Sequence, residues 1–412
     1  MKHQHLLLAL AALLLSACAS KNSLMSIDYF GFKEKEDGRW GLMNLRGEVL
    51  CESEFKNEPS YVVNDRLYVG TSEGKYQFYE ASENPQVIGD GIKYEQVGLF
   101  TGKYAPVLKK DGSIKYIDKN GDVAIDLQKK FPNKNIEVAF NYYNDRALIK
   151  VDGKCGAIDT DGKLVVPCKY AHAAAFYDDI AVFYEEEDEN GNMKWYLINR
   201  DGKVLLTRST ETIRPISFFR DGVCLAIINN DKHAIIDDKC KILHKLGDKH
   251  VYSRIANGMF IFEEDGSYGL MNTKGEVLIK AKYDNMDFNG HLVVGNIDDE
   301  WYLLDLNGKK IGDALDGRPL LLSEFVDGYD SFFFVNKDDH YFIYDADGNE
   351  LSLDVDIEEL GLSGRDYVEA AYGLPEEVEE DAVEQEELEE YADSTAVYEE
   401  PVDSVLIDDS YE

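Results

Sequence analysis

The sequence predicts an all-β fold of tandem small sheets, and three observations point to it. Two stretches that begin at Asp37 and Asp265 share the pattern DGxxGLMNxxGEVL, so the chain repeats itself. Related copies bring the total to nine, and Gly47 to Gly348 spans eight intervals of about 38 residues. Each copy holds short apolar runs between turn residues, which is the pattern of β-hairpins.

Each copy is expected to form at least three strands in a meander. The first strand follows a turn rich in Gly or Asp, as at 145–151 and 257–264. The second carries the most regular part of the pattern and ends in two apolar residues before an Asp or Asn. The third follows the turn, and the connector after it, such as 169–176 or 282–288, is expected to add a fourth strand.

The turn between the second and third strands has a chemical signature. An Asp or Asn opens it through its side-chain oxygen, and a Gly three residues later takes the positive φ of a hairpin with a bulge. The second copy is degenerate near Asn84, and the sixth has Cys240 in place of Gly. The turn glycines are Gly47, Gly121, Gly162, Gly202, Gly275, Gly308 and Gly348.

One column of the repeat is mostly aromatic, and in three copies a Gly follows it (Gly41, Gly156 and Gly269). Exposed rings in a row would suit a sugar or peptide ligand. Ile114 and Cys155 in the same column have no flat face, so we expect the column to be buried against the next repeat. The column is Trp40, Tyr76, Ile114, Cys155, Trp195, His233, Tyr268, Trp301 and Tyr341.

These motifs resemble the WG-repeat family of bacteria, named for the pair that Trp40 and Gly41 preserve. The resemblance covers residues 27–353 and is strongest in the first, fourth and seventh copies. It implies a repeat fold. Because the family is recognised by its pattern and not by a common activity, the resemblance implies no particular ligand.

The arrangement of the copies follows from their size. A single meander cannot bury its apolar face by itself, so neighbouring copies must cover one another. The period and the strand number favour a propeller-like array of nine meanders. An open β-solenoid is the alternative.

The first 17 residues predict a lipoprotein signal peptide. Lys2 precedes an apolar run at 6–15, and the segment LLSAC, which ends at Cys18, resembles a lipobox. The resemblance implies cleavage before Cys18 and acylation of its sulfur, with residues 18–26 as a linker. An ordinary secretory signal is the alternative. Because neither Asp nor an acidic cluster follows Cys18, we expect an outer-membrane lipoprotein that faces the periplasm.

Residues 354–412 predict an acidic tail, mostly disordered, with a short helix near 363–373. They contain 23 acidic residues and one basic residue, so they carry most of the chain's net charge of −37. Such a segment repels itself and cannot bury enough apolar surface to order. It is expected to be a solubilising spacer, with a tether for a basic partner or divalent cations as the alternative. The acidic balance excludes a role in binding nucleic acid.

The sequence shows no catalytic, cofactor-binding or metal-binding motif. Its histidines occur without paired ligand spacing. The segments DTDGK and DADGNE place Gly fourth, whereas an EF-hand loop needs it sixth, so they are interpreted as turns. Acidic residues are so abundant that no pair of carboxylates identifies a hydrolase.

Five cysteines remain after Cys18, an odd number for an oxidising compartment. The predicted hairpin places Cys155 opposite Pro167, so a single bulge would bring it to Cys168. We therefore expect a Cys155–Cys168 disulfide, with two small buried thiols as the alternative.

Three functional hypotheses follow. The first is a lipid-anchored, non-enzymatic scaffold that binds a protein or glycan. The second is a propeller hydrolase of envelope glycan or peptide, with its site in the central funnel, where no linear motif would show it. The third, an assembly factor at the outer membrane, differs from the first only in its partner.

Overall fold

The computed structural model describes residues 25–35, 38–177, 179–229, 231–322, 326–327 and 331–361. Contacts divide the chain into residues 1–374 and 375–412, and all described residues belong to the first unit. The predicted signal peptide, Cys18 and the helix near 363–373 lie outside the described residues. Most of the acidic tail does as well.

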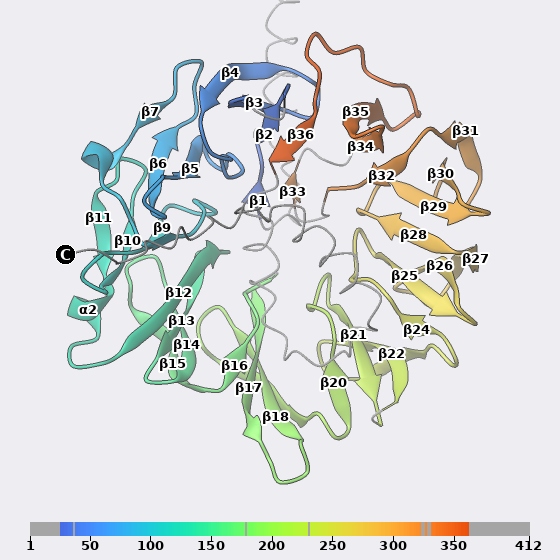
Figure 1. Ribbon diagram of the computed structural model, residues 1–412. Coiled ribbons are helices and arrows are strands. Elements are labelled where there is room, and N and C mark those ends of the chain that lie inside the picture. The colour runs from blue at the N-terminus through green and yellow to red at the C-terminus, as the bar shows by residue number, and fades with distance from the viewer. Residues whose placement is uncertain are drawn as a thin grey trace, which may run out of the picture. The chain divides into compact units, whose positions relative to one another are not determined.

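The described strands form nine successive antiparallel sheets, the blades of a β-propeller (Figure 1). Blade 1 contains β36 (Glu359–Gly361), β2 (Phe30–Lys33), β3 (Trp40–Met43) and β4 (Val49–Phe55), and blade 2 contains β5 (Arg66–Gly70), β6 (Tyr76–Glu80) and β7 (Gln86–Val87). Blade 3 contains β8 (Gln96–Val97), β9 (Ala105–Leu108), β10 (Ile114–Ile117) and β11 (Val123–Asp126), and blade 4 contains β12 (Ile136–Tyr143), β13 (Arg146–Val151), β14 (Lys154–Ile158) and β15 (Leu164–Tyr170). Blade 5 contains β16 (His172–Ala173), β17 (Ile180–Glu187), β18 (Met193–Asn199) and β19 (Val204–Ser209).

Blades 6 to 9 continue in the same order. Blade 6 contains β20 (Ile213–Pro215), β21 (Val223–Ile228), β22 (Lys232–Asp237) and β23 (Ile242–Lys245), and blade 7 contains β24 (His250–Val251), β25 (Met259–Glu264), β26 (Ser267–Asn272) and β27 (Val277–Tyr283). Blade 8 contains β28 (Asn285–Phe288), β29 (Val293–Ile297), β30 (Glu300–Leu304) and β31 (Lys310–Leu315), and blade 9 contains β32 (Arg318–Leu320), β34 (Phe332–Lys337) and β35 (His340–Asp345). The prediction of nine meanders in a propeller is confirmed.

Two short helical segments and one extra strand pair complete the described elements. A 3-10 turn, η1 (Gly89–Gly91), follows blade 2. The single helical turn α2 (Leu127–Lys130) follows blade 3, where the side chain of Asp126 caps it by accepting the N–H of Lys129. The strands β1 (Met25–Ser26) and β33 (Val326–Asp327) pair in parallel. None of the described helices is long and apolar enough to span a membrane.

The ring closes in blade 1, where the two ends of the described chain meet. Strand β36 pairs antiparallel with β2, with Gly31 opposite Gly361 and Lys33 opposite Glu359. The Lys33 ammonium also lies 2.5 Å from the Glu359 carboxylate. The predicted repeat domain ended at residue 353, but the structure continues the ring to Gly361. Part of the predicted tail is thus the innermost strand of a blade.

The connector does supply a fourth strand, but that strand belongs to the following blade. After β27 ends at Tyr283, residues Asn285–Phe288 form β28, which pairs with β29 and not with β26. The repeating motif therefore runs from the second strand of one blade to the first strand of the next. Each copy contributes strands to two successive blades, so the chain of every copy links two neighbouring sheets covalently.

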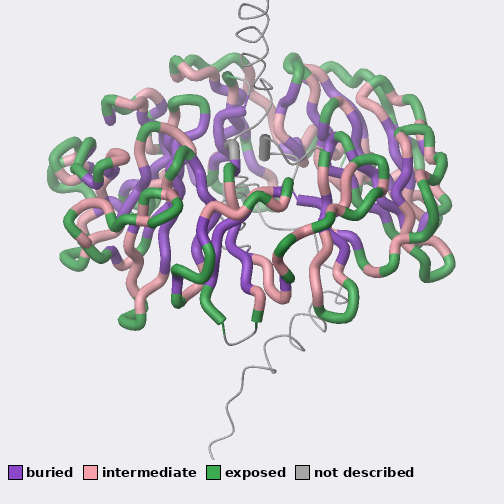
Figure 2. The backbone as a smooth tube through the Cα atoms, turned by 90° about the horizontal axis from the view of Figure 1, so that it is seen from above, coloured by how far each residue is buried: buried purple, intermediate pink, exposed green. Residues whose placement is uncertain are grey.

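The core lies between neighbouring blades. Trp195 of blade 5, for example, belongs to one buried cluster with Phe219, Cys224 and Ile236 of blade 6. Figure 2 shows buried segments along the middle of the strands and exposed residues at the turns. Each sheet is therefore covered by the next, as the apolar faces of the meanders require.

The turn between the third and fourth strands has the same hydrogen bonds in eight blades. In blade 4, Oδ1 of Asp159 accepts the backbone N–H groups of Asp161 and Lys163, and the N–H of Gly162 donates to the Asp159 carbonyl. The predicted turn glycines all have positive φ, and Cys240, which replaces one of them, takes φ 60°. A non-glycine residue there is costly, so the turn geometry is imposed by the fold.

Several turn glycines also lie against the preceding blade, and Gly202 gives the sharpest test of this geometry. A Cβ on Gly202 would lie 1.9 Å from the carbonyl oxygen of Val165, whereas Gly191 has similar φ and open space around it. We expect Gly202→Ala to lower the free energy of unfolding by about 3 kcal/mol and Gly191→Ala by about 1 kcal/mol. Urea unfolding of both variants measures the difference, and equal losses would contradict it.

Candidate functional site between blades 3 and 4

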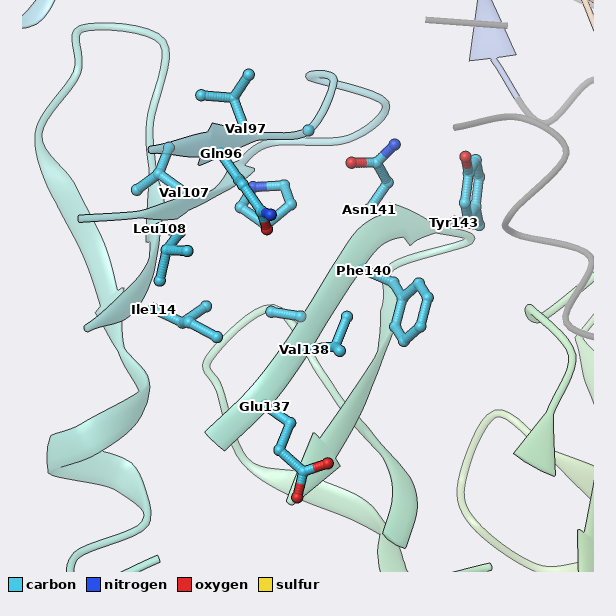
Figure 3. Close-up of a pocket in the computed structure, with 13 residues that line it drawn as sticks. Gln96, Val97, Val107, Leu108, Ile114, Glu137, Val138, Phe140, Asn141 and Tyr143 are labelled. Carbon is cyan, nitrogen blue, oxygen red and sulfur yellow. The ribbon is translucent and has the colours of Figure 1, made fainter. Parts of the chain in front are cut away.

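A pocket of about 200 Å³ lies between blades 3 and 4 (Figure 3). One wall is formed by β8, β9 and the start of β10, and the other by β12. In Figure 3, Leu108 and Ile114 lie on the first wall, and the Phe140 ring lies on the side of β12 away from them, where it packs on the cluster between blades 4 and 5. The lining residues are Gln96, Val97, Gly98, Pro106, Val107, Leu108, Ile114, Glu137, Val138, Ala139, Phe140, Asn141 and Tyr143.

The pocket exists because β12 bends away from a regular ladder. The pairing of β12 with β13 shifts between Ile136 and Val138 and again between Ala139 and Tyr142. Such bulges re-aim side chains and bend a strand. Val138 is 37% exposed, although it is a large apolar residue on an inner strand. The wall is therefore apolar and open to solvent.

The polar groups of the pocket are mostly engaged with the protein. The side-chain oxygen of Asn141 accepts the N–H of Leu99 at 3.0 Å. The Glu137 carboxylate accepts the N–H of Gly153 at 2.5 Å and lies 3.9 Å from the Lys150 ammonium. Burial raises the pKa of the Tyr143 phenol to about 12, so it stays neutral. This is a pocket for an apolar group, with fixed polar atoms at its ends.

Most members of the predicted aromatic column are buried or half-buried at a blade junction. Trp195 is fully buried and Trp40 nearly so. Tyr268 packs on a cluster that includes Met286 of blade 8, and Trp301 on one that includes Phe333 of blade 9. Half-buried members elsewhere are Tyr76, Cys155, His233 and Tyr341. The column therefore packs against the next blade, and these rings do not form an exposed row.

Several members of the column also reach the backbone of the next blade with a polar atom. Trp195 Nε1 donates to the carbonyl of Ile213 at 2.8 Å. His233 Nδ1 accepts the N–H of Val251 at 2.6 Å, and the Cys155 thiol lies 3.4 Å from the carbonyl oxygen of Ala171. Ile114 has no such atom, and the pocket opens beside it.

The contact of His233 predicts a pH dependence of stability. Burial, together with the nearby His250 and Arg214, lowers the pKa of His233 to about 4. An unfolded histidine has a pKa of about 6.5, so below that pH the unfolded chain binds a proton that the folded chain does not. The stabilisation by neutral His233 is fully present above pH 6.5 and is lost as the pH falls toward 4.

We expect the stability difference between the wild type and His233→Phe to shrink between pH 7.5 and pH 4.5. The variant keeps an aromatic ring and removes the titrating group. Chemical denaturation across this range measures the difference. A gap that does not change with pH would show that His233 does not titrate in this window.

The glycine of the Trp-Gly pair is required by a close backbone approach. A Cβ on Gly41 would lie 2.6 Å from the carbonyl oxygen of Cys51, and one on Gly156 would lie 2.6 Å from that of Val166. The same holds for Gly269 and Ile279, at 2.5 Å. In these blades the fourth strand bulges by two residues over the glycine.

This bulge corrects the predicted disulfide. Cys155 pairs with Tyr170 and not with Pro167, because Cys168 lies inside the bulged segment. Both cysteines are free thiols in the structure, as are Cys51, Cys224 and Cys240. Burial raises the pKa of Cys168 to about 11, so its thiol stays protonated.

The described residues contain no cluster of His, Cys, Asp and Glu that could hold a metal ion. The carboxylates of the turns accept backbone N–H groups, and such bonds from Lys309 and Asn307 lower the pKa of Asp305. These segments are turns in the structure, as their glycine spacing predicts.

Sequence reasoning did not identify the pocket. The only signal was Ile114, an aliphatic residue in a column that is aromatic in six of the nine copies. Whether a missing ring leaves a void depends on the opposite wall. Cys155 is also small, but its junction faces residues 171–175, four of which are alanines. The bulges of β12 could not be predicted from the repeat.

Comparison with known proteins supports the family and the fold. A family model described as WG containing repeat matches residues 156–187 and 268–290. No curated protein matches the chain. These two segments include the fourth and seventh copies, where the Trp-Gly resemblance is strong.

Among solved structures, the chain is similar to one described as the eukaryotic initiation factor. The two share 11% identity with a TM-score of 0.54, over 81% of this chain and 96% of that chain. The computationally designed Ika8 protein gives 12% identity and a TM-score of 0.38 over 80% and 98%. BamB from Moraxella catarrhalis gives 12% and 0.36 over 69% and 95%. At such identities only the fold is compared.

The matched repeats and the recurrence of their packing and turn positions in successive blades lead to one assignment. Two segments of the chain match the model of the WG containing repeat family, and the described chain folds as a nine-bladed β-propeller.

Proposed function

We propose that this protein is a non-enzymatic scaffold of the bacterial envelope that binds a partner protein through the pocket between blades 3 and 4. The observation that carries the proposal is the pocket itself, an apolar space of about 200 Å³ that opens to solvent between two blades. Open apolar pockets with a few fixed polar groups are typical binding sites. A glycan is the alternative ligand, but the apolar lining favours a protein.

The lining also bears on the hydrolase alternative. Glycoside hydrolysis generally needs two carboxyl groups that flank the scissile bond. Glu137 is the one carboxylate among the residues that line this pocket, and it already accepts the N–H of Gly153. Binding is therefore the function that this geometry supports best.

The proposal includes a membrane anchor. Cleavage before Cys18 and acylation of its sulfur would hold the protein on the outer membrane, facing the periplasm, because each buried CH₂ of the acyl chains contributes about 0.8 kcal/mol. The acidic segment after the propeller would act as a solubilising spacer, with attraction of a basic partner or divalent cations as its second role.

Site-specific photo-crosslinking tests the proposal. A photoreactive residue would be introduced at Val138 in the pocket, or at Leu205 on an outer strand as a control of similar exposure. We expect one specific protein adduct in intact cells from position 138, and its loss when Ile114→Trp fills the pocket. The same adducts from both positions, or none from position 138, would overturn the proposal. When membranes are solubilised in detergent, the Cys18→Ser variant should be found in the aqueous fraction and no longer with the detergent.

A further inference from the structure

We propose that the pocket between blades 3 and 4 binds an aromatic ring, of the indole or phenol class, presented by a partner protein. The statement that a partner protein supplies the ring rests on the proposed function, whereas the preference of the pocket for a ring does not. Its basis is that the pocket occupies the place where other blades of the same protein insert their own ring.

The equivalence follows from the strand register. Ile114 lies opposite Leu108 in blade 3 as Trp195 lies opposite Tyr184 in blade 5. Each is near the start of the third strand and faces the first strand of the next blade. Trp195 is fully buried there, whereas Ile114 forms part of the pocket wall. Replacing an indole by a sec-butyl group leaves space that the bulged β12 does not fill.

The other junctions show which chemistry this place accepts. Trp40, Trp301, Tyr268 and Tyr341 are all rings that pack on the following blade. At one junction the polar tip of the ring also meets backbone of the next blade, because Trp195 Nε1 donates to the carbonyl of Ile213. An aromatic ring with one polar atom is therefore the natural complement of the position.

The size and the lining agree with such a ligand. A cavity of about 150 Å³ lined by apolar side chains is enough to hold benzene, and this pocket measures about 200 Å³. Leu108 and Ile114 supply an apolar wall on blade 3, and Ala139 of β12 packs on the same cluster from blade 4. A buried ring in such a pocket is a frequent anchor of protein–protein interfaces, because it adds large contact area at little entropic cost.

Free indole and 4-methylphenol are the probes, titrated into the full-length protein and followed by calorimetry and by thermal shift. We expect saturable binding of both and a rise in the melting temperature. Ile114→Trp should weaken binding at least tenfold without lowering the melting temperature, because its own ring fills the space. Ile114→Val is the matched control and should keep binding within about threefold.

Two results would overturn the inference. One is indole binding that is absent in the wild type or unchanged in Ile114→Trp. The other is equally tight binding of cyclohexanol, which would show an apolar cavity with no preference for rings. Trp195→Ala gives a further readout, because free indole should restore part of its lost melting temperature if the column position accepts a ring. These probes need no native partner, so the binding of indole can be measured and interpreted even if the crosslinking experiment fails.

Discussion

A chain that ends after residue 353 is expected to be less stable by about 5 kcal/mol than a chain that ends after residue 374. The shorter chain lacks β36, so the ladder with β2 is lost and the ring opens at blade 1. It also lacks Ile357, which is 1% exposed in the cluster that joins blades 9 and 1. Removing a buried Ile costs about 2–5 kcal/mol, and each lost ladder hydrogen bond about 1 kcal/mol.

Thermal and urea unfolding of the two chains measure this difference, and both lack residues 375–412, so the charge of that segment does not enter the comparison. Ile357→Ala in the longer chain is the second control, because it keeps the strand and removes only the side chain. We expect it to lose about 3 kcal/mol. Equal stability of the two truncated chains would show that β36 does not close the ring.

Trp195→Ala is expected to lower the free energy of unfolding by about 5 kcal/mol. The indole is completely buried between blades 5 and 6, against Phe219 and Ile236. Truncating a buried Trp to Ala costs about 3–5 kcal/mol. The carbonyl of Ile213 also loses its donor, which adds about 1–3 kcal/mol if no water replaces it.

Two variants separate these contributions. Trp195→Phe keeps a ring and removes the N–H, so about 2 kcal/mol should be lost. Trp301→Ala removes a half-buried ring from the same column in blade 8, and we expect about 2 kcal/mol there. A loss at Trp195 no larger than at Trp301 would contradict the view that this column carries the contact between blades.

The column explains why the pair that names the family is so often incomplete in this chain. Its aromatic member fills a junction, and the size of ring required depends on the first strand of the next blade. Its glycine occurs in blades 1, 4 and 7, where the fourth strand bulges over the third, although blade 8 accommodates Tyr302 under the same bulge. In blades 3, 5 and 6 the ladder is regular at this point, and Lys115, Tyr196 and Ala234 occupy the position.

The sequence by itself determined the parts of this protein that depend on short-range geometry. The hydrogen bonds of Asp159 and the positive φ of Gly162 span five residues, so the turn can be predicted from its residues. The copies are similar enough to count, and nine meanders became nine blades. The resemblance to the WG-repeat family also rests on short local motifs, and the family model matches residues 156–187 and 268–290.

Only the tertiary structure decided which strands share a sheet, where the ring closes and where it leaves a space. Gly361 pairs with Gly31 across 330 residues, and no local pattern encodes that pairing. The two-residue bulge that separates Cys155 from Cys168 is a matter of register, which depends on how both faces of a strand pack. The pocket beside Ile114 depends on two walls from different blades, and a sequence describes each wall but not the distance between them.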